Sequence, residues 1–174
     1  SQNGEKRRKK RYHRHPRFSQ MESDELKKAR NDAYSFLSCR PRTTEEVRRK
    51  LREKGYPSAV IAGVIERLQD LGYLNDHDFA HQFALFSIKN KLWGNLRITK
   101  GLRERGIPRG IVEETLKEVG REFEEEKIAQ LVMEKKFSAF HPSKTDVKEK
   151  RRVIQHLKRR GFSWEVISRV VLKR

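Results

Sequence analysis

The sequence has only one cysteine, Cys39, among its 174 residues. A lone cysteine excludes an internal disulfide and a zinc site built from several thiolates, and it is typical of a reducing compartment. Long apolar runs are also missing, since the longest, residues 59–65, contains Gly63 and is far too short to cross a bilayer. The sequence therefore predicts no membrane-spanning segment, and we expect a cytoplasmic protein. The first residues lack the apolar stretch of a secretory signal, although their Arg and Lys content leaves a transit-peptide remnant as an alternative.

Acidic residues are scarce relative to basic ones. The chain has 24 Asp and Glu against 42 Lys and Arg, which gives a formal net charge of +18 and a pI of about 10.3. Such a balance is typical of proteins that bind nucleic acid or another polyanion. The excess lies in the tails, because residues 1–20 carry +7 and residues 148–174 carry +8, which leaves +3 for the middle. We therefore expect a negatively charged partner.

The basic N-terminal segment also has almost nothing to bury. Residues 6–11 are all Lys or Arg, and we predict that residues 1–22 form a disordered basic arm. The folded part is expected to begin near Ser23. From there the apolar residues follow a helical period, without the alternation typical of strands, so the fold class is all-α.

Three segments of the chain share one pattern, which consists of a leucine, three charged residues, a glycine and a large apolar residue. They are residues 51–57, 102–108 and 157–163. Four positions before each leucine stands a β-branched residue, Val47, Ile98 or Val153, and this spacing places both side chains on one helix face. The three glycines are 51 and 55 residues apart, so the repeated unit is about fifty residues long and has room for three helices.

The repeat predicts an elongated, curved array of three tandem three-helix units at residues 23–71, 72–119 and 120–174. Thr43 and Glu46 have capping-box spacing, Asp76 can cap the next helix, and we expect Tyr73 and Leu74 in the core between units. The repeated glycines stand where a helix must end. The predicted helices are 24–39, 44–54, 58–71, 76–91, 95–105, 108–119, 121–136, 146–160 and 164–173.

Beyond the shared pattern, each unit carries further motifs. These are Ala29, Ala33, Tyr34, Leu37, Arg40 and residues 44–51 in the first unit; 72–76 (GYLND), 79–80, 93–94 (WG), 97–98 and 102–107 in the second; and 157–163 with 166–167 in the third. Together they resemble the RecX family of bacterial regulatory proteins, which bind the RecA recombinase. The resemblance covers residues from about 25 to 172. Asn75 and Gly101 depart from it, because the family usually has a second aspartate at the first position and commonly an acidic residue at the other.

The resemblance implies three tandem three-helix repeats, no enzymatic activity and no cofactor. It implies binding to RecA filaments on single-stranded DNA and inhibition of the RecA ATPase and of strand exchange, and hence a role in homologous recombination, DNA repair and the SOS response. Double-stranded DNA is a second candidate partner. We expect a monomer without a membrane partner.

The basic residues of the three middle helices are the candidate binding residues. Lys and Arg usually mark a solvated helix face, but their recurrence on corresponding helices of an array predicts a continuous positive stripe suited to a polyanion. Trp93 is expected either to pack the junction between units or to offer a stacking platform, and packing is favoured. The predicted site comprises Arg48, Arg49, Arg52, Trp93, Arg97, Lys100, Arg103, Arg105, Lys150, Arg151, Arg152, Lys158, Arg159 and Arg160.

Two other kinds of function stay open at this point. His77 and His81, beside Asp76 and Asp78, would suit a metal-dependent nuclease, although capping and helix-dipole roles for the two aspartates are favoured and no metal is predicted. A helical DNA- or RNA-binding protein without a RecA partner is the second alternative. No helix concentrates Asn, Gln and Arg for base recognition, and the sequence has no phosphate loop or nucleophile elbow.

Overall fold

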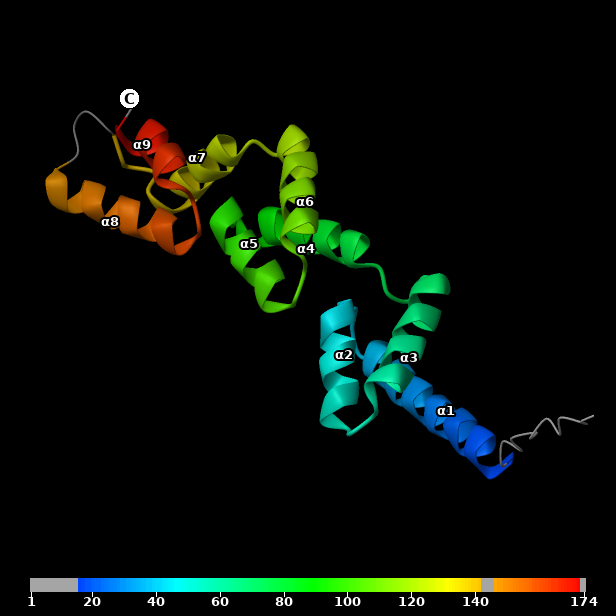
Figure 1. Ribbon diagram of the computed structural model, residues 1–174. Coiled ribbons are helices and arrows are strands. Elements are labelled where there is room, and N and C mark those ends of the chain that lie inside the picture. Colours follow the sequence, from blue (N-terminus) through cyan, green and yellow to red (C-terminus); the bar gives the residue numbers. More distant parts are fainter. Residues whose placement is uncertain (1–15, 142–145, 173–174) are drawn as a thin grey trace, which may run out of the picture.

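The computed structural model of the protein describes residues 16–141 and 146–172. Within these residues it consists of helices, without strands, and the predicted all-α class is confirmed (Figure 1). The helices are α1 (Pro16–Ser38), α2 (Thr44–Glu53), α3 (Ser58–Asp70), α4 (Asp76–Lys91), α5 (Asn95–Glu104), α6 (Arg109–Glu122), α7 (Glu125–Lys136), α8 (Val147–Arg159) and α9 (Trp164–Leu172).

Most predicted bounds agree with these to within a residue, but two predictions were wrong. Helix α1 begins at Pro16, inside the segment expected to be a disordered arm. Proline is well suited to a first helical turn, and no helix breaker follows it before the apolar period begins. Residues 1–15 of the predicted arm lie outside the described residues. Helix α6 continues to Glu122, and α7 begins only at Glu125, because the chain first leaves the helical conformation at Phe123.

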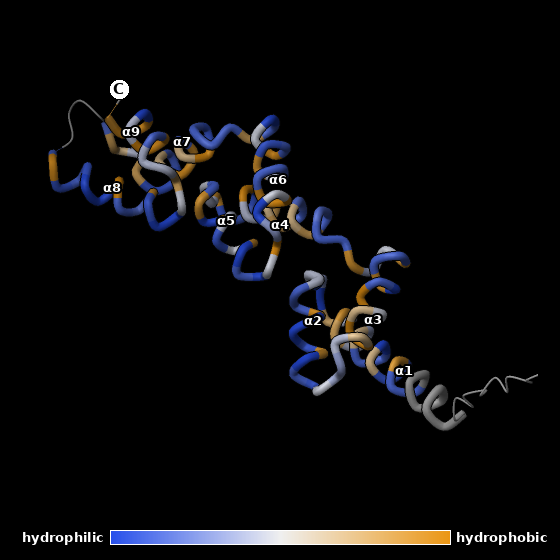
Figure 2. Tube along the Cα trace, in the orientation of Figure 1, coloured by the Kyte–Doolittle hydropathy of each residue, from blue (hydrophilic) through white to orange (hydrophobic). Residues whose placement is uncertain are grey.

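The repeat positions form the cores of the units. Val47, Ile98 and Val153 are fully buried, as are the leucines four residues after each of them, which confirms that these positions correspond. The buried residues fall into two clusters, one within α1–α3 and one that runs through α4–α9. Figure 2 shows that α2 and α8 are mostly hydrophilic outside their core positions. The second and third units therefore share a core that the first unit does not enter.

The helix ends follow the predicted chemistry with one correction. The capping box of Thr43 and Glu46 is present at the start of α2. Asn75, and not Asp76, caps α4, since its side-chain oxygen accepts from the backbone amides of His77 and Asp78 at 3.1 Å each. Asp76 instead accepts a hydrogen bond from the backbone amide of Thr44, 2.8 Å away in the preceding unit. An aspartate placed one residue after the cap is therefore available to connect two units.

The middle helices meet end to end at both junctions between units (Figure 1). The Thr43 hydroxyl, at the start of α2, donates to the carbonyl of Arg105 at the end of α5, with an O···O distance of 2.6 Å. The Gly94 amide, at the start of α5, donates in the same way to the carbonyl of Arg160 at the end of α8, at 2.8 Å. Opposite ends of helix dipoles thus face each other.

A second contact is also repeated at both junctions. The backbone amide of Asn95 donates to the Glu125 carboxylate at 2.8 Å, as that of Thr44 does to Asp76. Both acceptors are the first residue of the next unit's first helix. The array is therefore built by repeating one junction, with α2, α5 and α8 following one another. No helix in the described part of the chain is long and apolar enough to span a membrane.

Candidate polyanion-binding cleft

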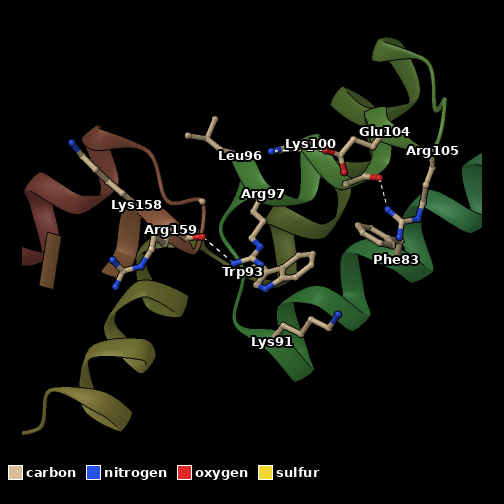
Figure 3. A pocket seen from close by; sticks show the side chains of 12 residues that line it. Phe83, Lys91, Trp93, Leu96, Arg97, Lys100, Glu104, Arg105, Lys158 and Arg159 are labelled. Carbon is tan, nitrogen blue, oxygen red and sulfur yellow. Dashed lines mark hydrogen bonds and ion pairs between the residues drawn. The ribbon is translucent and has the colours of Figure 1, made fainter. Parts of the chain in front are cut away.

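A cleft of about 730 Å³ lies where the second unit meets the third (Figure 3). Its walls come from α4, α5 and the C-terminal end of α8. The lining residues are Phe83, Lys91, Trp93, Leu96, Arg97, Lys100, Gly101, Glu104, Arg105, Lys158, Arg159 and Gly161. Six of them are basic and one is acidic, so the cleft is a concentrated positive region. We call it the main cleft.

The backbone at the junction brings these side chains together. Helix α4 ends at Lys91, and the next residue, Leu92, adopts the left-handed conformation with φ of 49° and turns the chain toward α5. Gly94 is buried, and a Cβ atom there would lie 2.5 Å from the carbonyl group of Gly161. Gly161 has φ of 85°, and a Cβ on it would lie 2.4 Å from the backbone nitrogen of Arg97. Only glycines allow the end of α8 to approach the start of α5 this closely.

Trp93 packs inside this junction and contacts two of the cations. Its ring centroid is 6.3 Å from that of Phe83, in an edge-on arrangement. The guanidinium of Arg97 lies 4.3 Å from the Trp93 ring and the ammonium of Lys91 lies 4.6 Å from it (Figure 3). Both distances are within the range of cation–π attraction. The geometry favours the packing role for Trp93, and its contact with a ligand stays a prediction.

Internal hydrogen bonds orient two arginines of the main cleft, Arg97 in α5 and Arg105 directly after it. Arg97 Nη1 donates to the carbonyl of Arg159 at 2.9 Å. Arg105 Nη1 donates to the carbonyl of Gly101 at 2.7 Å, and its guanidinium lies 4.9 Å from the Phe83 ring centroid. Each bond uses a single nitrogen, so other donors of the same guanidinium stay available for an anion. The cleft is thus partly preorganised.

The acidic residue of the main cleft, Glu104, offsets little of this charge. Its carboxylate lies 3.8 Å from Lys100 Nζ, and both side chains are largely exposed. Such a pair contributes little to stability, because solvent screens it. Lys100 can therefore turn to a stronger anionic partner at small cost.

A second hollow, of about 630 Å³, adjoins the main cleft and shares Lys91, Trp93, Arg97 and Arg159 with it. Its remaining lining residues are Asn90, Leu92, Lys135, His156 and Arg160, and none of the lining residues is acidic. The His156 ring is nearly buried. Burial, together with the charges of Lys136, Arg160 and Arg159, lowers the pKa of His156. His156 is therefore neutral near pH 7, and its Nε2 accepts a 3.1 Å hydrogen bond from Arg160 Nε.

The structure gathers half of the predicted site residues and separates the rest. Trp93, Arg97, Lys100, Arg105, Lys158 and Arg159 line the main cleft, and Arg160 lines the second hollow. Arg49, Arg52 and Arg103 are exposed on α2 and α5 outside both. Arg48 contacts Glu45 at 2.5 Å, and Lys150 is half-buried on α8. Arg151 and Arg152 line a separate hollow near the start of α8 that also holds Asp146 and Glu149.

Sequence reasoning missed four of the basic or aromatic residues that line the two hollows. Lys91 stands two residues before Trp93, so a search for cations beside the tryptophan could have found it. Lys135 and His156 come from different helices of the third unit, and Phe83 has no basic neighbour in the sequence. No signal in the chain joins Lys135 and His156 to Trp93, because only the junction between units brings them close. Phe83 contacts Trp93 within the second unit, where the chain turns after α4.

The histidines considered for a metal site lie elsewhere. His77 Nδ1 is 3.5 Å from the Glu114 carboxylate, which joins α4 to α6. Asp78 accepts from the Asn75 side-chain amide at 2.7 Å, and Asp76 accepts from Thr44 as described. Among the described residues, no group of three His, Cys, Asp or Glu side chains could hold a metal ion. Both aspartates thus have structural partners.

Comparison with known protein families matches the chain unit by unit. The descriptions of the matching models are RecX first three-helix domain for residues 29–68, RecX second three-helix domain for 75–116 and RecX third three-helix domain for 124–171. Each range corresponds to one group of three helices, α1–α3, α4–α6 or α7–α9, and the second and third ranges begin at the residue before the first helix of their group. The repeat found in the sequence thus has the same register as the family's domains.

Relatives and solved structures agree with this match. The regulatory protein RecX of Pelodictyon phaeoclathratiforme is 32% identical over 135 residues, which cover 78% of this chain and 81% of that protein. That of Bacillus subtilis is 37% identical over 147 residues and is longer, since the match covers 83% of this chain and 54% of the relative. The crystal structure of RecX from Lactobacillus salivarius has a TM-score of 0.75 and 25% identity, and covers 87% of this chain and 97% of its own. With all three domain models matched in order, the chain belongs to the RecX family of regulatory proteins.

Proposed function

We propose that the protein is a non-enzymatic regulator that binds RecA filaments on single-stranded DNA and inhibits the RecA ATPase and strand exchange. Membership of a regulatory family supports the class of function. The main cleft carries the rest of the proposal, because six cations and one carboxylate at a junction form a surface for a polyanion or an acidic protein groove.

The shape of the array supports binding to a filament. The middle helices α2, α5 and α8 follow one another, so their exposed cations are spread along the molecule and can contact more than one filament subunit. Multivalent contact raises avidity without requiring any single strong site. A binder that prefers one filament conformation shifts the filament toward it by the difference in affinity. A monomer is sufficient for this mechanism.

The first test is inhibition of the RecA ATPase on single-stranded DNA. The charge reversals Lys100→Glu and Lys158→Glu change two exposed residues of the main cleft. Like charges opposed at a contact cost several kcal/mol, so roughly tenfold or more of the double variant should be needed for equal inhibition. The matched control, Lys117→Glu with Arg121→Glu, makes the same charge change on exposed positions of α6 outside the cleft and should inhibit as the unmodified protein does.

Two outcomes would contradict the proposal. An equal loss of RecA inhibition in both double variants would mean that only net charge matters and that the main cleft is not the binding site. Absence of any effect of the unmodified protein on RecA, together with tight DNA binding, would favour the alternative of a helical DNA- or RNA-binding protein without a RecA partner.

A further inference from the structure

An exposed tryptophan lies next to the main cleft without being part of the core. Trp164 is the first residue of α9 and is 56% exposed. The buried face of α9 consists of Val166, Ile167, Val170 and Val171. More than half of this tryptophan is therefore left uncovered, and its position calls for another explanation.

The other two units show that packing does not require an aromatic residue at this position. Ser58 and Arg109 stand at the corresponding places, the first residues of α3 and α6, and both are exposed. A hydrophilic residue is thus compatible with the same turn and the same helix start. The third unit alone places a large aromatic ring there.

Lys158 connects this ring to the main cleft. Its ammonium lies 5.4 Å from the Trp164 ring centroid, and the same side chain lines the cleft together with Arg97 and Arg159. A partner that neutralises the cleft cations thus comes within reach of the indole. Trp93 differs, because its ring already contacts Phe83 and two cations within the junction.

We propose that Trp164 stacks on an unpaired base of a single-stranded nucleic acid whose phosphates lie along the cations of the main cleft. An aromatic ring beside a basic groove is the arrangement with which proteins bind single strands irrespective of sequence. Duplex bases are already stacked on one another, so the ring adds affinity for single strands only. The inference rests on the nucleic-acid contact in the proposed function and names the residue and the ligand group involved.

The test compares polyanions with and without bases. Binding of oligo(dT), of a duplex of equal length and of inorganic polyphosphate is measured for the unmodified protein, Trp164→Ala and Trp164→Phe. Trp164→Ala should weaken oligo(dT) binding about tenfold and leave polyphosphate and duplex binding unchanged. Trp164→Phe keeps a ring and should retain most of the affinity. Oligo(dT) should quench tryptophan emission in the unmodified protein more than in Trp164→Phe.

Tyr73→Ala is the matched control. The expectation that Tyr73 lies in the core between units was wrong, since this residue is 59% exposed, and it lies outside both hollows. It should bind all three polyanions normally, and circular dichroism shows whether each variant is folded. Equal loss of oligo(dT) and polyphosphate binding in Trp164→Ala, or no loss of either, would overturn the inference.

The RecA ATPase assay separates this inference from the proposed function. If Trp164→Ala binds oligo(dT) normally but no longer inhibits RecA, the ring contacts the protein partner, and the base-stacking inference is wrong while the proposed function stands. If the unmodified protein has no effect on RecA but Trp164→Ala loses oligo(dT) binding selectively, the proposed function fails and the inference stands.

Discussion

Individual polar residues at the junctions connect units as well as helix ends. The Thr43 hydroxyl accepts from the Glu46 amide at 3.1 Å and donates to the Arg105 carbonyl at 2.6 Å, so one buried oxygen serves a cap and a junction together. The Glu125 carboxylate accepts from both the backbone and the side-chain amide of Asn95, at 2.8 and 3.0 Å. Residues of this kind make the stability of the array sensitive to single substitutions.

The stability of the junction between the second and third units should depend on pH through Glu125. Burial raises the pKa of Glu125 above its ordinary value of 4.5, although the hydrogen bond from Asn95 acts in the opposite direction. A raised pKa means that the folded state binds the proton more tightly than the unfolded state does. The folded state therefore loses stability as the pH rises from 4.5 through the raised pKa.

Glu125→Gln removes this titration and isolates it from the other carboxylates. The free energy of unfolding of the unmodified protein minus that of Glu125→Gln should fall across this pH window and be constant above it. Glu118→Gln, at an exposed position on α6, should show no such trend. If the difference in the free energy of unfolding rises with pH instead, the hydrogen bond from Asn95 has a larger effect on the pKa of Glu125 than burial has.

At the scale of helices, the turns that follow the middle helices differ in how closely their glycines approach a neighbouring unit. Gly55 and Gly161 both have φ of 85°, but a Cβ on Gly55 would meet nothing within 4 Å, whereas on Gly161 it would meet Arg97 at 2.4 Å. Gly55→Ala should therefore cost only the left-handed strain, about 1–2 kcal/mol. Gly161→Ala should cost a further 1–3 kcal/mol, because it also forces α5 away from α8. Thermal unfolding of both variants tests this, and equal costs would contradict the close contact.

The helices were predictable from the sequence, whereas the main cleft and the second hollow were not. Gly55 and its counterparts, together with Val47 and the matching residues, define helix ends and core faces by local spacing, and the structure follows them. The cleft depends on contacts such as that between Arg97 and Arg159, which are 62 residues apart. Spacing within a helix carries no information about which ends meet. The repeat predicted which residues are equivalent, but not that their helices stand end to end.

Over residues 16–141 and 146–172, the molecule has two apolar cores, which are joined by a mainly polar junction. The apolar cluster of α1–α3 is separate from the one that runs through α4–α9. The contacts described between these parts are the hydrogen bonds of Thr43 with Arg105 and of Thr44 with Asp76, and the approach of Gly106 to Glu45. The first unit should therefore open without disturbing the other two, whereas those should unfold together.

Two matched core substitutions test this division. Leu51 and Leu157 are both fully buried and occupy the same place in the repeat, and each change to Ala should cost about 2–5 kcal/mol. Hydrogen exchange should become faster only in α1–α3 for Leu51→Ala, because that core ends within the first unit. For Leu157→Ala it should become faster throughout α4–α9, since Leu157 belongs to the shared cluster. Faster exchange in α5 and α6 on substitution of Leu51 would mean that the polar junction transmits unfolding, and that the three units form one cooperative body.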